Sequence, residues 1–511
     1  MVRHGRLSTG CQTCRKRKIK CDKLRPACTQ CVRSGWHCPR DADSADRMFI
    51  YCEPQRAAIN TFKAVHATMS RNASSDAKHL VPTTKHRREH LVSAPKLPME
   101  IVQPLHCRAS EYYLANHVLR PTRAIRGYNE YLYTFSAEVL RDPMVATSLS
   151  AVGLAAYSYK YQYPEILSEA RCEYVRSLRF INSALSSSQA NAATDAIVIS
   201  ILLLISYESH TAETRRTMSN RYAHVKGAAT LLCLRGDASI SSCPRRQLFH
   251  HLFSCISVHC IMLSLPIPGD LVLLHEKALR YVDTTSDPAW RLSELIIKVI
   301  EFRDELRSGR IRDPDTIIVA AQKLDSELAS VADTFPFSWQ YEIFTSQGRS
   351  ELVFGEDFHV YPDLWIAYNW NNLRACRMIL LDEIRRQLEQ RTILAHPCMM
   401  AGLLQHQRTL VKLHQLSSEI CATVPQHCGY HLELLNCTGP NEPSSPHKQL
   451  RDSDTSIPRD AGAHLLFWPF INAGQFTPSQ HQRNWIAGRI PSVGQQGALI
   501  ADILKLGQRV F

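Results

Sequence analysis

Six cysteines between Cys11 and Cys38 are the residues whose type and spacing point most clearly to chemistry. They follow the pattern C-x2-C-x6-C-x6-C-x2-C-x6-C, so the second three repeat the spacing of the first three: Cys11, Cys14, Cys21, Cys28, Cys31 and Cys38. Two thiolates separated by two residues can chelate one tetrahedral zinc ion, and the outer cysteines can complete its shell. Six sulfurs are too few for two separate four-sulfur sites and too many for one. The pattern therefore predicts two zinc ions that share two bridging thiolates.

This short segment needs a metal or a covalent staple in order to fold. Its only sizeable apolar side chains are Ile19, Leu24, Val32 and Trp36, which cannot bury enough surface. A disulfide framework is one alternative, but it requires an oxidising compartment, and the polar, basic residues 1–10 do not resemble a secretory leader. A chance cluster of free thiols is the other, and the repeated spacing argues against it.

Positive charge is concentrated around the same cysteines. The chain has 511 residues and a net charge of +13, and +10 of this charge lies within residues 1–40, where eleven Lys and Arg face the single acid Asp22. A basic surface confined to one small module indicates a polyanionic partner for that module. The other twelve cysteines are scattered, without a second C-x2-C pair, which favours a reducing, nuclear or cytosolic setting.

The cysteine segment resembles the fungal binuclear zinc cluster transcription factors. It shares with them the six cysteines, the basic run 15–18 between the second and third cysteine, and Pro26 in the central loop. The resemblance implies that Cys11 and Cys28 are the thiolates that bridge the two zinc ions.

The resemblance also implies which side chains contact double-stranded DNA. The first short helix of the family enters the major groove, where Lys18, with Arg17 beside it, would read a CGG-type triplet. Lysine and arginine can donate to guanine O6 and N7, which distinguishes bases directly. Arg15, Lys20 and Lys23 match positions that contact phosphates, which set affinity and register but not sequence.

Residues 41–104 have the composition of a linker, polar and punctuated by proline, and we predict that they are largely disordered. Within them, apolar spacing over residues 59–69 covers only about two heptads, whereas a dimerising coiled coil needs at least about three. Residues 85–88 (Lys-His-Arg-Arg) are either a nuclear import patch or a solvated basic stretch.

From about residue 105 the apolar pattern becomes helical, and we predict an all-α body over 105–511 with a loop insert at 438–461. The apolar run 196–207 is far shorter than the ~20 residues of a membrane span, so it predicts a buried helix. Gly236 is expected to end a helix. Other helical faces are predicted from Leu149, Val152, Ala156 and Tyr159; from Val225, Ala229 and Leu232; from Leu248, Phe249, Leu252, Phe253 and Ile256; and from an amphipathic segment, Leu292 to Leu306.

Four stretches of this body resemble the large fungal-specific regulatory domain that follows the cluster in many family members. They are AVGLAAYS at 151–158, HVKGAATLLCLRG at 224–236, FPFSW at 335–339 and FWPFINAG at 467–474. The resemblance implies an all-α fold with a regulatory role, often inhibitory or effector-sensing.

Catalytic signatures are poor. The sequence has no phosphate-binding loop, no dinucleotide-binding glycine motif and no nucleophile elbow. His275-Glu276 begins like a zinc-protease motif, but Leu279 stands where the second histidine would be. We interpret His250, His251 and His259 as packed or surface histidines. The acid pairs Asp382-Glu383 and Asp304-Glu305 are interpreted as solvated helix faces.

These observations predict a nuclear, sequence-specific transcription regulator of RNA polymerase II genes that is not an enzyme and has no membrane segment. Residues 1–40 would form the zinc cluster domain, with two Zn²⁺ per chain, and 105–511 the regulatory domain. Control of a metabolic or secondary-metabolite pathway is expected from the family. A homodimer and a small-molecule effector or co-regulator of the helical body stay open. Two other functions are alternatives to this prediction. In one, the helical body is an enzyme or a ligand-binding scaffold and DNA contact is secondary; in the other, the cluster binds protein instead of DNA.

Overall fold

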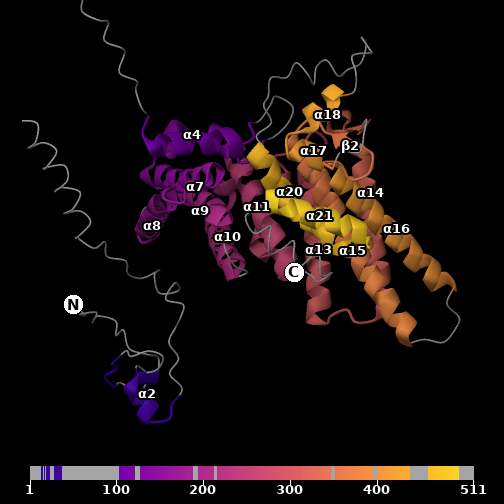
Figure 1. The fold of residues 1–511 in the computed structure, drawn as a ribbon, viewed down its shortest axis with the longest axis horizontal. Coiled ribbons are helices and arrows are strands. Elements are labelled where there is room, and N and C mark those ends of the chain that lie inside the picture. Colours follow the sequence, from indigo (N-terminus) through magenta and orange to yellow (C-terminus); the bar gives the residue numbers. More distant parts are fainter. Residues whose placement is uncertain are drawn as a thin grey trace, which may run out of the picture. The chain divides into compact units, whose positions relative to one another are not determined.

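A computed structural model describes the chain in two compact units, Met1–Met99 and Glu100–Phe511 (Figure 1). The described residues are 13–14, 17, 19–22, 28–36, 103–120, 127–187, 194–211, 216–346, 351–394, 400–437 and 459–493. The predicted linker up to residue 102, the heptad-like residues 59–69, the basic residues 85–88 and most of the predicted insert lie outside them.

The second unit is built almost entirely of α-helices, so the predicted all-α class is confirmed. Its first helices are α4 (Leu105–His117), α5 (Tyr131–Thr134), α6 (Ala137–Leu140), α7 (Pro143–Tyr161), α8 (Ile166–Leu185), α9 (Thr194–Thr211), α10 (Arg216–Arg235), the 3-10 helix η2 (Gly236–Ile240), α11 (Cys243–Leu263) and α12 (Gly269–Leu279). Its later helices are α13 (Ala289–Ser308), α14 (Pro314–Asp333), the 3-10 helix η3 (Phe337–Trp339), α15 (Leu364–Leu394), α16 (Met400–Ala422), α17 (Val424–His427), α18 (His431–Cys437), α20 (Arg459–Phe476) and α21 (Gln480–Val493).

The earlier helices pack around α7, which contacts α4, α8 and α9. The later helices pack around α15, which contacts α13, α14, α16 and α20. Between these two groups lie α11, which contacts α9, α10 and α13, and α20, which contacts α4 as well as α15 and α16 (Figure 1). One continuous apolar core runs through both groups, so the unit is a single body.

The apolar run 196–207 forms the middle of α9 and is buried, as predicted. Of its two serines, Ser206 donates its hydroxyl to the Leu202 carbonyl one turn earlier, at 3.2 Å, and the Ser200 hydroxyl is buried without a hydrogen-bond partner. No helix in the described ranges is long and apolar enough to span a bilayer.

Several helix ends follow from local sequence signals. Asp142 caps α7 by accepting the Met144 backbone N–H at 2.8 Å, and Pro143 follows at the first helical position. Asp313 caps α14 in the same way, with Pro314 after it. Gly236 ends α10 with a φ of +63°, a left-handed conformation that glycine adopts at no steric cost, so this prediction is confirmed.

Most of the predicted helical faces are buried. Val225, Ala229 and Leu232 are each at most 2% exposed, and the five apolar residues predicted for α11 at most 1%. The segment from Leu292 to Leu306 lies within α13.

Three details differ from the prediction. Tyr159, predicted on a buried face, is 47% exposed. A two-stranded antiparallel sheet was not predicted: β1 (Glu342–Thr345) pairs with β2 (Asp357–Val360). The predicted insert also ends too late, because α20 begins at Arg459 and the prediction ran to residue 461.

Candidate metal centre and nucleic-acid interface

Three of the predicted zinc ligands meet in the first unit. The side chains of Cys14, Cys28 and Cys31 are fully buried, and their sulfurs all lie within 4.8 Å of one another. Cys28 precedes the short helix α2 (Thr29–Arg33), and Cys31 lies within it. This spacing brings both thiols to one side, because three residues make almost one helical turn.

A second group contains Cys21, Asp22 and Cys28, whose ligand atoms also lie within 4.8 Å of one another. Cys28 therefore belongs to both groups. Asp22 already has a structural role: its carboxylate oxygens accept the Thr29 backbone N–H at 3.2 and 3.1 Å, at the start of α2. Sequence reasoning missed this cap, because Asp22 lies seven residues before the helix it caps.

The sulfur geometry fits zinc and does not fit a disulfide. The Cys14 and Cys28 sulfurs are 3.6 Å apart. A disulfide would require about 2.05 Å, whereas two sulfurs bound tetrahedrally to one zinc at about 2.3 Å are separated by about 3.8 Å. The described cysteines can therefore hold zinc with little rearrangement. When bound, the metal would fix this chain segment as a rigid core.

The repeat in the sequence is also a repeat in the backbone. The Cys14 carbonyl accepts the N–H of Ile19, five residues later, at 3.0 Å, and the Cys31 carbonyl accepts the N–H of Trp36, again five residues later, at 2.9 Å. Both hydrogen bonds end a short helical turn that carries cysteines, so the two halves of the segment have the same local fold.

A cation–π contact joins the two halves. The Arg17 guanidinium lies over the indole ring of Trp36, with its central carbon 3.9 Å from the ring centroid. Such pairs contribute roughly 0.5–1 kcal/mol at exposed sites. The contact draws one of the predicted base-reading residues onto the cluster, a role the sequence did not indicate.

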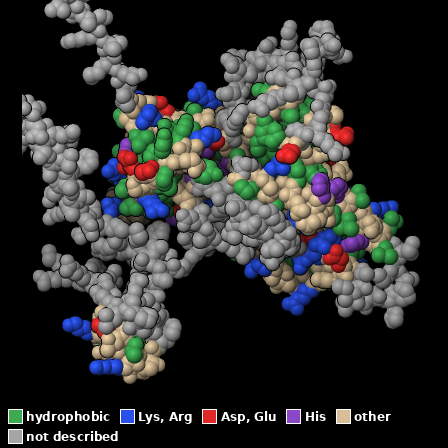
Figure 2. All heavy atoms as spheres, in the orientation of Figure 1, with side chains coloured by type: hydrophobic (Ala, Val, Ile, Leu, Met, Phe, Trp, Pro, Cys, Tyr) green, Lys and Arg blue, Asp and Glu red, His purple; other side chains and the backbone are tan. Residues whose placement is uncertain are grey.

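The described basic side chains of this unit are at the surface, as DNA contact requires. Arg17, Lys20 and Arg33 are exposed, and Figure 2 shows Lys and Arg side chains of the unit in blue on the face drawn. Five of the predicted site residues lie outside the described residues: Cys11, Arg15, Lys18, Lys23 and Cys38.

Comparison with known families assigns both units. Residues 9–47 match the fungal Zn(2)-Cys(6) binuclear cluster domain. Residues 118–335 match the fungal specific transcription factor domain. The chain therefore carries both domains of a fungal binuclear zinc cluster transcription factor. Both matches point to a transcription factor.

The curated relatives are similar only in the cluster. The heme-responsive zinc finger transcription factor HAP1 of Saccharomyces cerevisiae is 54% identical over 33 residues, which is 6% of this chain and 2% of that protein. The Zn(2)-C6 fungal-type transcription factor afumD of Aspergillus fumigatus is 50% identical over 38 residues, 7% of this chain and 10% of that protein. No solved structure matches the chain.

The histidines that could suggest catalysis in this zinc cluster protein are packed into its core. His275 is fully buried and bonds through Nε2 to the Ser293 hydroxyl at 2.7 Å, among aromatic rings that include Phe253. His250, His251 and His259 are at most 9% exposed, in agreement with the interpretation as packed residues.

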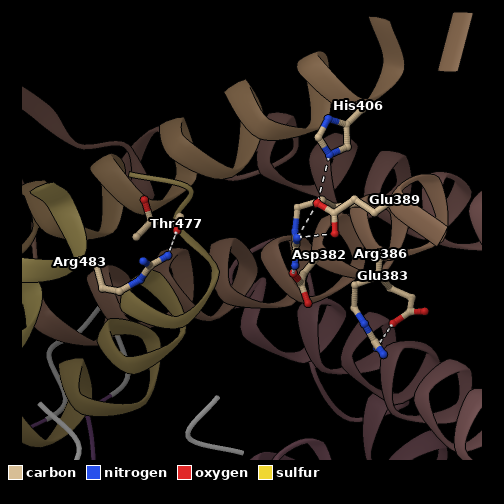
Figure 3. Close-up of polar contacts among 8 residues, drawn as sticks. Asp382, Glu383, Arg386, Glu389, His406, Thr477 and Arg483 are labelled. Atoms are coloured by element: carbon tan, nitrogen blue, oxygen red, sulfur yellow. Dashed lines mark hydrogen bonds and ion pairs between the residues drawn. The ribbon is translucent and has the colours of Figure 1, made fainter. Parts of the chain in front are cut away.

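Three of the four acids, Asp382, Glu383 and Asp304, are ion-paired, which corrects their interpretation as solvated faces. Asp382 is only 4% exposed and accepts from Arg385 at 2.7 Å, while Glu383 accepts from Arg386 at 2.8 Å (Figure 3). Asp304 is 8% exposed and accepts from two arginines of its own region, Arg307 at 2.7 Å and Arg310 at 2.8 Å. The i+3 arginines in the sequence were the available signal, since residues three apart are neighbours on a helix.

Proposed function

We propose that this protein is a nuclear regulator of RNA polymerase II genes that reads CGG-type triplets through a cluster of two zinc ions. Cys11 and Cys28 would bridge the metals, and the other four cysteines would complete the two tetrahedral shells. The observation that carries this proposal is the shared position of Cys28 in both cysteine groups, together with the matched cluster domain.

The charge distribution supports two different roles for the basic residues in DNA binding. Lys18 is proposed to read guanine, with Arg17 beside it, because direct readout of a base needs a donor placed by a rigid core. Arg15, Lys20 and Lys23 are proposed to contact phosphates, which are recognised without regard to sequence. The Arg17–Trp36 contact would stiffen the tip that carries Lys18.

Replacing the reading residue tests the proposal. Lys18→Ala should remove the preference of the full-length protein for a CGG-containing duplex over a scrambled one, while salt-sensitive binding to both persists. Competition gel shifts at several salt concentrations measure both properties. Survival of the preference in the variant would show that another residue reads the triplet.

Lys20→Ala is the matched control, because Lys20 is exposed and is assigned to phosphate. It should weaken binding to the two duplexes alike and reduce the slope of log K against log salt by about 0.9. A change in preference instead of slope would reverse the assignment of the two lysines.

Further parts of the proposal are expected from the transcription factor family whose domains the chain matches. Nuclear localisation and control of a metabolic or secondary-metabolite pathway are part of the proposal. A homodimer and a regulatory ligand of the helical unit are part of the proposal as well.

A further inference from the structure

A cavity of about 150 Å³ lies between the two groups of helices in the second unit. Its walls come from α9, α10 and α11 on one side and from α15 and α20 on the other. Figure 1 shows α11 and α20 between these groups. An apolar cavity of this size in another protein accommodates benzene, so one aromatic ring fits.

The wall of the cavity is largely aromatic. Tyr128, Trp365, Tyr368, Phe467 and Trp468 all line it, and aliphatic side chains from α9 and α20 fill the spaces between them. Apolar, aromatic walls with a few placed polar groups are typical of sites for small molecules. Flat rings of the wall favour a flat ligand, because aromatic rings stack or meet edge to face.

Arg221 of α10 brings a positive charge to the cavity, and the Glu208 carboxylate attracts it from beyond ion-pair distance. Its Nη1 donates to the Ser209 hydroxyl at 3.1 Å, while its Nε is buried without an acceptor. Burial lowers the pKa of this guanidinium. Among the described residues, no carboxylate lies within 4.0 Å of it, and the neighbouring Glu208 bonds instead to the Tyr174 hydroxyl at 2.8 Å. Because no described carboxylate is in ion-pair contact with this half-buried cation, a negatively charged ligand group would stabilise it further.

Two of the three histidines that line the cavity, His259 and His464, add no positive charge at neutral pH. Burial lowers the pKa of His259 and of His464 to about 4, so both imidazoles are neutral. His259 Nδ1 lies 2.7 Å from the Cys255 carbonyl, which can only accept, so Nδ1 carries the proton. The site therefore suits a single negative charge.

The serines of the cavity cannot substitute for Arg221 as donors. Ser206 donates to the Leu202 carbonyl at 3.2 Å, and Ser254 donates to the His250 carbonyl at 2.9 Å. Each hydroxyl has one hydrogen, and it is already used within its own helix. An anionic oxygen in this cavity would thus be held by the guanidinium.

We propose that this cavity is a binding site for a small aromatic carboxylate, with the ring among the aromatic walls and the carboxylate on Arg221. Because the walls come from both helix groups, an occupied cavity would hold those groups together. Use of the site as an effector site rests on the proposed function, whereas binding itself does not.

Calorimetric titration of the full-length protein tests the proposal with benzoate and 2-naphthoate as probes and benzamide as the neutral analogue of benzoate. We expect at least one carboxylate to bind with a Kd below about 1 mM, and benzoate to bind at least about tenfold more tightly than benzamide. Absence of binding by both carboxylates, or equal binding of benzoate and benzamide, would overturn the proposal.

Two variants locate the site. Arg221→Met keeps the unbranched stem of the side chain as far as the position of Nε and removes the charged group, so carboxylate binding should fall at least about tenfold while benzamide binding stays within about threefold. Val258→Phe places a ring in the cavity and should abolish binding of all three probes. Unchanged carboxylate binding in both variants would place the ligand elsewhere.

Gel shifts with the same two variants keep this test separate from the proposed function. DNA binding without ligand should be unchanged, since the cluster lies in the other unit. Failure of the wild-type protein to select a CGG duplex would count against the proposed function and would leave the ligand-binding result intact.

Discussion

At the scale of single residues, Arg374 of α15 is the most heavily constrained charge in the helical unit. It is 1% exposed, and its Nε donates to Glu419 of α16 at 2.8 Å. Its Nη1 donates to the Tyr361 hydroxyl at 2.8 Å and to Asn371 at 3.0 Å. The guanidinium also lies 5.2 Å from the centre of the Trp370 ring. One side chain thus connects α15, α16 and the end of the small sheet.

Removing this charge should be far more costly than breaking a surface pair. Arg374→Ala removes the cation that pairs with Glu419 and the donor to the Tyr361 hydroxyl and to the Asn371 side-chain oxygen. Breaking a buried ion pair costs about 3–5 kcal/mol. Denaturant unfolding of the full-length protein, followed by far-UV circular dichroism, measures the loss.

Lys277→Ala is the matched control, because Lys277 pairs with Asp237 at 2.7 Å on the surface, with both side chains about half exposed or more. Exposed pairs contribute about 0–1 kcal/mol. Similar losses in the two variants would mean that the Arg374 network contributes no more than a surface pair.

At the scale of elements, the crossing of α4 and α7 depends on a residue without a side chain. A Cβ added at Gly153 of α7 would lie 2.6 Å from the Ala109 carbonyl oxygen and 2.9 Å from the Ser110 nitrogen. Both are backbone atoms of α4, which cannot move aside as a flexible side chain would. The two helices therefore pack backbone to backbone at this point.

Gly153→Ala should consequently destabilise the protein, although alanine is the better helix former. Separating the two helices disturbs a packed core, which typically costs about 1–3 kcal/mol.

Gly227→Ala in α10 should have the opposite effect, since no atom lies within 4 Å of the added Cβ; the expected gain is about 0.5–1 kcal/mol. Thermal unfolding of the two variants checks both signs, and a stabilised Gly153 variant would contradict the close crossing.

The sequence predicts an element well when the residues that determine it lie close together in the chain. The spacing of the cysteines was informative because all six fall within 28 residues and each C-x2-C pair spans about one helical turn. The end of α10 was predictable because Gly236 acts through its own φ. Tyr159 was misplaced, because periodicity identifies the face of a helix but not how far the packing covers it.

Contacts between distant segments were beyond prediction. The cavity joins Arg221, His259 and His464, which lie on three helices and are separated by up to 243 positions in the chain. The acids Asp382 and Asp304 were misread because burial depends on the helices packed around them. The cap made by Asp22 was missed for the same reason. Its hydrogen-bond partner, Thr29, lies seven residues away, and no helical periodicity in the sequence connects the two.

At the scale of the whole molecule, buried neutral histidines should make the helical unit sensitive to acid. Burial lowers the pKa of His210, His275 and His427 to about 4, against about 6.5 in the unfolded chain. Between pH 6.5 and 4 the unfolded chain binds more protons, so the free energy of unfolding falls as pH falls, by up to about 1.4 kcal/mol per pH unit for each such histidine. Above pH 6.5 these residues contribute no pH dependence.

His275→Phe isolates one of these contributions. The ring would stay among aromatic neighbours, and the Ser293 hydroxyl would keep its bond to the Trp290 carbonyl at 2.6 Å. Urea unfolding at pH 7, 6 and 5 should show a shallower loss of stability in the variant, by up to about 1.4 kcal/mol per pH unit below pH 6.5. Parallel pH profiles would show that His275 is protonated in the folded protein.

Because the chain divides into two compact units, we expect the removal of zinc to unfold only the cluster. The cluster has only a few apolar side chains, and its buried residues are the cysteines themselves, so its folding free energy must come from metal binding. The helical unit has its own continuous core and needs no metal for it. Chelation of zinc should therefore abolish DNA binding and release two zinc ions per chain, while the helical circular-dichroism signal and the main thermal transition change little. Loss of the helical signal on chelation would show that the two units fold as one.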